Sequence, residues 1–468
     1  MLVIVMRSKL SATIGGKWQI LDYNLDGELT CIPDTGEITL VIHYVDYFPF
    51  KKFQKFNKVL DIKEIWGVTS FRQKCVLLEC QFISDYSFNA DHELTIKAKY
   101  LIWDMTKVKD EEIKFNKMSF RLTNSLLWSG MQCYNSFKKD DKYLISCDFG
   151  EKIIKSDLKT EIKFCATINS IDGFMRAEKI ELYQYLEVII KKSELTHYTE
   201  FLEDIKKVIN LIKLATNEEV NINEICGYRN DKTYVCGDKK YYYEFCMVTN
   251  EMRNNILSYC DDTNYLYSLP NMISEGKIEV WFKTYNDYKN VYELYLLSYK
   301  DEVSSEISFI YLVQALELLH RIKFKNKNKF MKYLKNKLQD KKELWDNIRE
   351  NSDQEDSRYI ILRSRLIDMI DCDFEIKNDF KEETIIKLAD IITNSRNYYT
   401  HFSESKKEKC VRKKSLSYVM EILRYFIKCY ALKELGFDIN YINEKTESSL
   451  EYIRYYNMIE KILSENGD

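Results

Sequence analysis

The spacing of apolar residues changes along this chain of 468 residues, and this change most constrains its fold. In the N-terminal third, stretches such as EITLVIHYV and ELTIKAKYLIW are rich in β-branched and aromatic residues, which is typical of strands. From about residue 286 onward, apolar residues recur every three or four positions, which predicts amphipathic helices. Because the chain is also too long for a single hydrophobic core, we predict an α+β protein with several domains.

Three regions are expected. Residues 1–170 should form a β-rich domain of the sandwich or barrel type, beginning with a strand at the N-terminus and turning at Leu25-Asp26-Gly27 and at Pro33-Asp34-Thr35-Gly36. Residues 171–285 should form a mixed segment, in which EKIELYQYLEVIIKK and FLEDIKKVINLIKLA have helical spacing while KTYVCG and KYYYEFCMV are typical of strands. Residues 286–468 should form an all-α helical bundle, in which the helix KKSLSYVMEILRYFIKCYALKELG ends at Gly436 and the helix SSLEYIRYYNMIEKIL closes the chain.

Composition argues against several classes of protein. The 13 cysteines are odd in number, contain no CxxC pair and do not cluster with the five histidines, so we expect no metal site, no cofactor and no disulfide framework. Neither a signal peptide nor a run of about 20 apolar residues is present, which favours a cytoplasmic protein without a membrane span. With a net charge of −3, any contact with nucleic acid must be local.

The candidate catalytic residues are Arg396, Asn397 and His401, which lie near the end of the predicted amphipathic helix KEETIIKLADIITNSRNYYTH. Its buried stripe is expected to be formed by Ile385, Leu388, Ala389 and Ile392 and to be continued by Arg396. Asn397 and His401 are four residues apart, so they share a helical face beside Arg396. An imidazole can exchange protons with a ribose 2′-hydroxyl and with the leaving oxygen, because its pKa lies near neutrality. A guanidinium can bind the scissile phosphate, and an amide can orient it, so this set favours ribonuclease chemistry.

A second interpretation stays open for this site. Cations at the end of a helix can simply complement the helix dipole, which would explain Arg396 and His401 without catalysis. Glu317 is a possible supporting residue, although its spacing from Arg321 also fits an ion pair within one helix. The tryptophans Trp18, Trp66 and Trp128 are better explained as core residues than as ligand platforms.

Basic residues are concentrated in two segments of the C-terminal region, one between Arg321 and Lys337 and the other between Lys406 and Lys414. The stretch between Arg321 and Lys337 contains eight basic residues and no acidic one, and aromatic residues are interspersed among them. A basic loop with exposed rings suits single-stranded or looped RNA, although such a segment can also be a solvated connection between helices. The predicted RNA-binding residues are Lys323, Lys325, Lys327, Lys329, Lys332, Lys406 and Lys407.

The segment from Arg396 to His401 resembles the motif of HEPN ribonucleases, in which an arginine and a polar residue are followed by a short spacer and a histidine. The N-terminal half resembles the corresponding domain of ApeA-like anti-phage defence proteins, in which a β domain precedes a HEPN domain. The residues that carry this second resemblance are Gly16-Lys17-Trp18, Gly27-Glu28-Leu29, Gly36-Glu37-Ile38, Leu122-Thr123-Asn124, Trp128 and Gln314-Ala315-Leu316-Glu317.

The resemblance implies a metal-independent endoribonuclease that acts in abortive anti-phage defence. Attack by the 2′-hydroxyl would leave a 2′,3′-cyclic phosphate, and two copies of the HEPN bundle would form a dimer with a composite site. A phage-derived trigger is a possible further partner. The alternative from another class is a non-catalytic HEPN module that binds a nucleotide or a partner protein.

Overall fold

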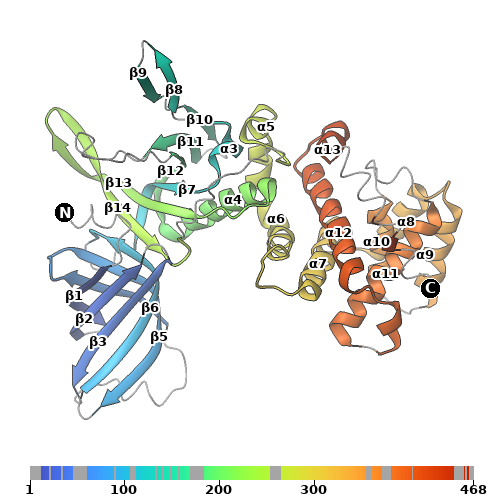
Figure 1. The fold of residues 1–468 in the computed structure, drawn as a ribbon, viewed down its shortest axis with the longest axis horizontal. Coiled ribbons are helices and arrows are strands. Elements are labelled where there is room, and N and C mark those ends of the chain that lie inside the picture. The colour runs from blue at the N-terminus through green and yellow to red at the C-terminus, as the bar shows by residue number, and fades with distance from the viewer. Residues whose placement is uncertain are drawn as a thin grey trace. The chain divides into compact units, whose positions relative to one another are not determined.

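The structure of the chain is a computed structural model, and it divides into two compact units (Figure 1). The first unit comprises Met1–Ile209 and Glu218–Thr263, and the second comprises Asn210–Asn217 and Asn264–Asp468. The residues that the structure describes are 12–20, 23–32, 35–45, 61–88, 91–105, 112–131, 134–139, 142–147, 150–155, 159–168, 184–252, 265–354, 360–371, 381–402, 404–446, 458 and 461–462.

The first unit consists mainly of antiparallel strands. Its elements are β1 Ala12–Ile20, β2 Tyr23–Ile32, β3 Glu37–Val45, β4 Asp61–Thr69, β5 Lys74–Phe88, β6 Asp91–Trp103, β7 Lys114–Leu122, α3 Leu126–Ser129, β8 Tyr134–Lys139, β9 Lys142–Cys147, β10 Glu151–Lys155, β11 Thr160–Ile168, β12 Gln184–His197, α4 Tyr198–Thr216, β13 Ile222–Cys236 and β14 Lys239–Thr249. The last seven residues of α4 are grouped with the second unit.

Six of these strands close into a barrel. The antiparallel order is β1-β2-β3-β6-β5-β4, and β4 pairs back to β1. The sheet then continues from β6 through β14, β13, β7, β12 and β11 to β10, while β8 and β9 form a separate hairpin. A barrel with additional strands confirms the predicted β-rich fold.

The indole of Trp18 fills the barrel interior and is fully buried. Its Nε1 donates a hydrogen bond to the carbonyl of Gly27 over 3.2 Å. A Cβ atom at Gly67 would lie 2.2 Å from the Trp18 ring, so only glycine fits there. The predicted turn at Asp26-Gly27 is wrong, because both residues lie within β2, where Gly27 provides room for the ring and for β3. Trp18 is therefore a core residue, as predicted, and so are Trp66 and Trp128.

The helix expected over EKIELYQYLEVIIKK is also wrong for its described part, which forms the strand β12. Leu186, Val188 and Ile190 are buried at every second position, and β12 lies between β11 and β7. The β-branched run favours a strand, and pairing on both sides outweighs the weak helical spacing. The neighbouring prediction is confirmed, because FLEDIKKVINLIKLA forms most of α4.

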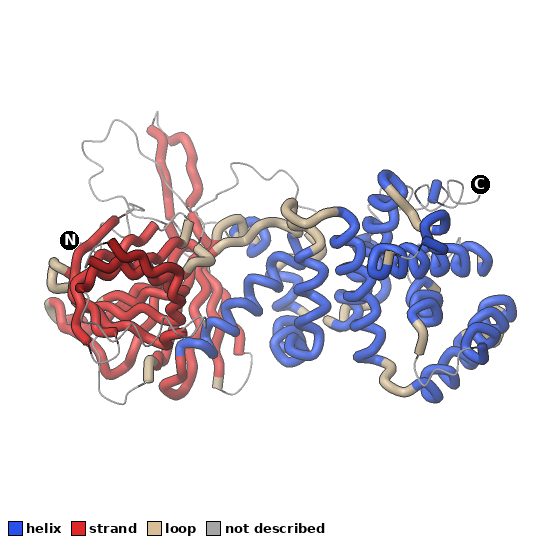
Figure 2. Tube along the Cα trace, turned by 90° about the horizontal axis from the view of Figure 1, so that it is seen from below, coloured by secondary structure: helices blue, strands red, loops and turns tan. Residues whose placement is uncertain are grey.

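The second unit is almost entirely helical (Figure 2). Its elements are α5 Leu269–Ser274, α6 Lys277–Leu297, α7 Ser305–Lys323, α8 Lys327–Lys337, α9 Lys342–Gln354, α10 Leu362–Ile370, α11 Glu382–His401, the 3-10 helix η3 Glu404–Lys409, α12 Lys413–Glu434 and α13 Ile439–Thr446. This unit confirms the predicted C-terminal all-α bundle.

The end of α12 illustrates how local sequence defines these helices. Gly436 has a positive φ of 84°, its N–H donates to the carbonyl of Lys433, and the N–H of Phe437 donates to the carbonyl of Leu432. These two bonds make a Schellman motif, and they satisfy carbonyls that the helix end would otherwise leave unpaired. The predicted strand over residues 1–10 lies outside the described residues, as does almost all of the predicted last helix. None of the described helices is long and apolar enough to cross a membrane.

Candidate active site

The helix α11 positions the three predicted catalytic residues on its last two turns. Its buried face consists of Ile385, Leu388, Ala389, Ile392 and Ser395, and the four apolar residues are those that the sequence predicted. The buried stripe is continued by Ser395 and not, as the sequence had predicted, by Arg396. Arg396 lies at the edge of the buried face and is half-buried. The packing of α11 therefore leaves the motif residues along a boundary between the core and solvent.

The chain beyond α11 folds back against the motif turns. Phe402 ends the helix with a positive φ of 51°, and its side chain is 73% exposed. The N–H of Val411 donates to Oγ of the buried Ser395 over 3.0 Å, and Tyr399 donates its hydroxyl to the carbonyl of Val411 over 2.7 Å. Burial raises the pKa of Tyr399 to about 12, so its hydroxyl stays protonated and remains a donor. These bonds fix the position of η3 beside the catalytic candidates.

The structure brings two of the three candidates into direct contact. Arg396 donates a hydrogen bond from Nη1 to Oδ1 of Asn397 over 3.2 Å, and both side chains are half-buried. His401 is exposed at the end of α11, and no described residue forms a hydrogen bond or ion pair with its imidazole. Within one chain, the guanidinium and the amide form a pair, and the imidazole stands apart at the helix end.

Glu317 forms the ion pair that was the alternative interpretation of this residue. Nη2 of Arg321 lies 2.6 Å from Oε1 of Glu317, one turn away on α7. The carboxylate is largely buried and Arg321 is mostly exposed. This ion pair joins two successive turns of α7, so the contact of Glu317 is with its own helix.

The expected basic loop is wrong, because most of it is the helix α8. Asn326 begins α8 by accepting a hydrogen bond from the N–H of Lys329 over 3.1 Å, which satisfies a donor at the helix start. The rings of Phe324, Phe330 and Tyr333 pack against one another, with centroids 4.7 to 5.1 Å apart. Phe330 is fully buried, so these rings form a small core rather than exposed platforms for bases.

The lysines of this segment separate into two groups. The exposed ones are Lys323, Lys325, Lys329, Lys332 and Lys335. Lys327 is half-buried, and Lys337 is turned toward the bundle, where it pairs with Asp368. In the second basic segment, Lys406 and Lys407 lie in η3, and Lys407 is exposed.

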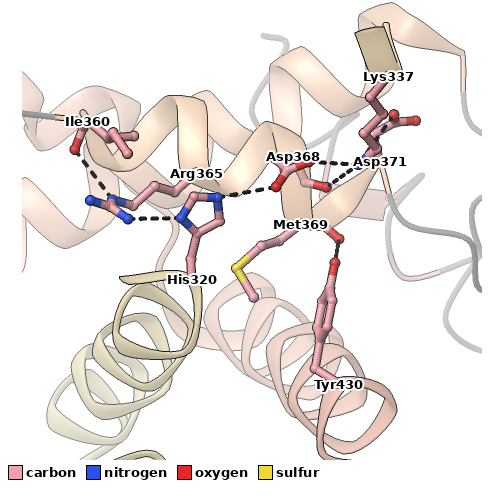
Figure 3. Close-up of polar contacts among 8 residues, drawn as sticks. All are labelled: His320, Lys337, Ile360, Arg365, Asp368, Met369, Asp371 and Tyr430. Carbon is pink, nitrogen blue, oxygen red and sulfur yellow. Dashed lines mark hydrogen bonds and ion pairs between the residues drawn. The ribbon is translucent and has the colours of Figure 1, made fainter. Parts of the chain in front are cut away.

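A buried charged network in the same unit was not predicted from the sequence (Figure 3). Nε2 of His320 on α7 lies 3.2 Å from Oδ2 of Asp368 on α10, and Nη1 of Arg365 lies 2.8 Å from Nδ1 of the same imidazole. Lys337 donates to Oδ1 of Asp368 over 2.7 Å and lies 3.8 Å from Asp371. The imidazole and Asp368 are each less than a tenth exposed, so the network joins three helices inside the bundle.

The protonation of this network follows from its burial. Burial lowers the pKa of His320 below its ordinary value of 6.5. For Asp368, burial acts to raise the pKa, but the hydrogen bond from His320 and the charge of Lys337 outweigh it and lower the pKa below 3.8. A detectable signal was present in the sequence, because Asp368 is the one charged residue within the run Leu366–Ile370, and Arg365 and Asp371 flank this run.

The family comparisons agree with this two-part architecture. The family model described as ApeA N-terminal domain 1 matches residues 14–264, which is more than half of the chain. The chain belongs to the ApeA-like family. A second family model, described as Apea-like HEPN, matches residues 310–441, so this ApeA-like chain carries a C-terminal HEPN domain. Comparisons with curated proteins and with solved structures found no match.

The HEPN match begins within α7 and ends within α13, so it includes the buried network and all three catalytic candidates. A HEPN domain in an ApeA-like architecture supports, in broad terms, a nuclease-type role in defence. Among the described residues, no group of three or more His, Cys, Asp or Glu side chains is placed to hold a metal ion.

Proposed function

We propose that this ApeA-like chain is a HEPN endoribonuclease whose catalytic residues are Arg396, Asn397 and His401. The observation that carries the proposal is the position of the three residues on the last two turns of α11, within the matched HEPN domain. The exposed imidazole of His401 is accessible to a substrate, and Asn397 orients the guanidinium of Arg396 at the edge of the core.

In the proposed reaction, the imidazole of one His401 accepts the proton of a ribose 2′-hydroxyl, whose oxygen then attacks the adjacent phosphorus. The bond from phosphorus to the 5′-oxygen breaks, and a protonated imidazole supplies the proton to this leaving oxygen. Arg396 binds the non-bridging oxygens and stabilises their added charge in the transition state. The products are a 2′,3′-cyclic phosphate and a 5′-hydroxyl, and the reaction needs no metal ion.

The active form is a homodimer through the HEPN domain. One chain offers the imidazole of a single His401, which forms no hydrogen bond with Arg396 or Asn397. A two-fold arrangement of two motif turns would bring a second imidazole to the scissile phosphate, so that one His401 acts as base and the other as acid. Glu317 supports α7 through its ion pair with Arg321 and takes no part in proton transfer.

RNA reaches this site along the exposed basic surfaces of α8 and η3. On α8, the buried residues Phe330 and Leu334 direct Lys329 and Lys332 to the opposite, solvent-facing side. Lys406 and Lys407 lie in η3, which is anchored to the motif turns through Val411. The biological role is abortive defence, in which a phage-derived trigger activates cleavage of host RNA in the cytoplasm.

The deciding experiment compares RNA cleavage by the purified wild-type chain with that of His401→Ala, Arg396→Ala and Thr400→Ala. Thr400 is exposed on the same turn, so its variant is a matched control for the helix end. We expect the first two variants to lose about 100- to 10,000-fold of the cleavage rate and the control to retain it. Full cleavage by purified His401→Ala would instead favour a non-catalytic HEPN module that binds a nucleotide or a partner.

A further inference from the structure

The hairpin of β13 and β14 extends beyond the strands that flank it (Figure 1). On one side, β7 pairs with β13 only from Ile222 to Tyr228, and on the other, β6 pairs with β14 only from Met247 to Thr249. The distal half, in which residues 233–236 pair with residues 239–242, is therefore a two-stranded ribbon. Gly237, with a φ of 62°, makes the tight turn at its tip.

Three tyrosines form a ladder on one face of this ribbon. Tyr234 lies opposite Tyr241 in the register, and their rings stack with centroids 5.6 Å apart and an interplanar angle of 21°. The ring of Tyr243, two residues further along β14, lies 5.1 Å from that of Tyr234. The three side chains are 41% to 49% exposed, so the strand pairing holds their rings in place while leaving them accessible to solvent.

Lysines lie at both ends of this tyrosine ladder. Lys239 precedes Tyr241 by two residues, so strand alternation places it on the same face near the tip. At the base, Lys232 and Tyr243 line the same cavity of about 390 Å³. Both lysines are exposed, and neither forms an ion pair with another described residue. Rings at the centre with cations at the ends match a chain of bases with flanking phosphates.

The opposite face of the ribbon differs in chemistry. Val235, which is 72% exposed, pairs with Lys240 there, and Tyr242 lies alone, with the ammonium of Lys117 at 5.9 Å from its ring. Exposed aliphatic surface, which a protein partner would cover, therefore belongs to the Val235 face and not to the tyrosine ladder. The ladder offers flat rings with a lysine near each end, while the cavity at its base is also lined by Asp104, Glu112 and Glu244.

We propose that the face carrying Tyr234, Tyr241 and Tyr243 binds single-stranded nucleic acid, with bases stacked on the rings and phosphates near Lys232 and Lys239. Every base has a π-face, so such a surface binds without strong sequence preference. This site is in the first unit and is distinct from α8 and from the catalytic candidates. It does not depend on RNA cleavage by the HEPN domain.

Binding is tested with the full-length chain carrying His401→Ala, which keeps an RNA probe intact under the proposed chemistry. The probes are an oligouridine and an oligodeoxythymidine of about 12 nucleotides, within the length that comparable surfaces cover. Tyr241→Ala and Tyr243→Ala should each weaken binding by about 5- to 100-fold. The matched control is Tyr242→Ala, which removes an equally exposed ring from the opposite face and should bind like the parent.

A photo-crosslinking experiment separates this surface from other basic regions of the chain. An oligonucleotide that contains 5-iodouridine should form adducts on the hairpin peptide at Tyr234, Tyr241 or Tyr243. Equal affinities of Tyr241→Ala, Tyr243→Ala and Tyr242→Ala would overturn the proposal, as would adducts confined to α8 and η3. Loss of binding to a protein partner with unchanged binding of both probes would also reject it, in favour of a protein-docking surface. Each readout is binding, so an inactive HEPN domain would leave the test intact.

Discussion

Arg365 donates a hydrogen bond from Nη1 to Nδ1 of His320 over 2.8 Å, and this contact fixes the tautomer of the buried imidazole. A guanidinium can only donate, so Nδ1 must be the unprotonated acceptor. The ring proton is then on Nε2 and is donated to Asp368 over 3.2 Å (Figure 3). His320 is therefore neutral in the folded bundle, in agreement with the lowering of its pKa by burial.

The neutral state of His320 makes stability depend on pH. The unfolded chain binds a proton at His320 near its ordinary pKa of 6.5, whereas the folded chain does so only at lower pH. The unfolded state thus holds more protons below about pH 6.5, so the free energy of unfolding should fall as the pH is lowered, by at most about 1.4 kcal/mol per pH unit. Asp368 does not contribute in this range, because its pKa is lowered from 3.8.

Thermal unfolding of the full chain between pH 7.5 and 5.5 measures this effect, the range being about one unit on each side of the ordinary histidine pKa. His320→Gln should flatten the pH dependence, even if it lowers the midpoint at every pH. His43→Gln removes an exposed imidazole from the barrel and should keep the wild-type slope. Equal slopes for all three proteins would contradict a neutral His320.

Asp368 and Asp390 provide a comparison between a buried and a partly exposed ion pair. Asp368 is 6% exposed and accepts from both His320 and Lys337, whereas the carboxylate of Asp390, which pairs with Arg363, is 43% exposed. Asp368→Asn should lower the free energy of unfolding by about 3–5 kcal/mol, because it leaves buried partners uncompensated. Asp390→Asn should cost no more than about 1 kcal/mol. If denaturant titrations gave the same loss in the free energy of unfolding for both variants, the buried network would contribute no more to stability than the partly exposed pair.

The barrel offers a matched pair of glycines. An added Cβ at Gly67 would lie 2.2 Å from the ring of Trp18, whereas one at Gly15 would meet no atom within 4 Å. Gly67→Ala should therefore destabilise the first unit by about 1–3 kcal/mol through overpacking. Gly15→Ala should change stability by less than about 0.5 kcal/mol. Chemical denaturation followed by tryptophan fluorescence measures the midpoint, with Trp18 as one of six tryptophans that contribute to the signal. Equal midpoints would mean that the ring can move away from residue 67.

Sequence predicted those elements whose local pattern and tertiary setting agree. The stripe of Ile385, Leu388, Ala389 and Ile392 defined α11, and Gly436 marked the end of α12, because helical periodicity and the left-handed cap are local properties. The catalytic candidates could be located on α11 for the same reason. Their contacts could not, because the bond between Arg396 and Asn397 depends on side-chain conformations that helical periodicity does not specify.

The predictions were wrong where contacts with distant strands or helices determine the local structure. Asp26-Gly27 has a typical turn sequence, yet Gly27 serves the packing of Trp18 across the barrel. The segment over β12 has helical spacing, but two neighbouring strands supply its hydrogen bonds. Lys337 belongs to a basic run in sequence, yet its partner Asp368 is on another helix. Such pairings join residues far apart in the chain, and local periodicity carries no information about them.

The exposed lysines of α8 should contribute to the salt dependence of RNA binding. Charge reversal of Lys329, Lys332 and Lys335 should reduce the slope of log affinity against log salt by about 0.7 for each lost phosphate contact. Thermal stability should change little, because exposed charges contribute little to it. Charge reversal of Lys283 and Lys300, which are exposed elsewhere in the unit, is the control. An unchanged slope in the α8 variant would mean that these lysines are solvated and make no contact with RNA phosphates.

The proposed chemistry separates this protein from metal-dependent nucleases. A two-metal site needs several carboxylates or histidines that converge on paired ions. Around the motif, Arg396 and Asn397 contribute no carboxylate, and Asp390, the nearest acidic residue before them on α11, is already paired with Arg363. In the proposed mechanism, proton transfer by imidazole provides the catalysis, and it requires a 2′-hydroxyl as the internal nucleophile.

Cleavage should consequently persist in excess EDTA, and a DNA strand of the same sequence should stay intact. The RNA products should end in a 2′,3′-cyclic phosphate and a 5′-hydroxyl, which mass spectrometry of a short cleaved oligonucleotide identifies. A substrate in which a 2′-deoxy nucleotide replaces the one at the cleavage site is the sharpest control, because it removes the nucleophile and retains every phosphate. Cleavage of that substrate, or loss of RNA cleavage on chelation, would exclude the mechanism while leaving the HEPN fold untouched.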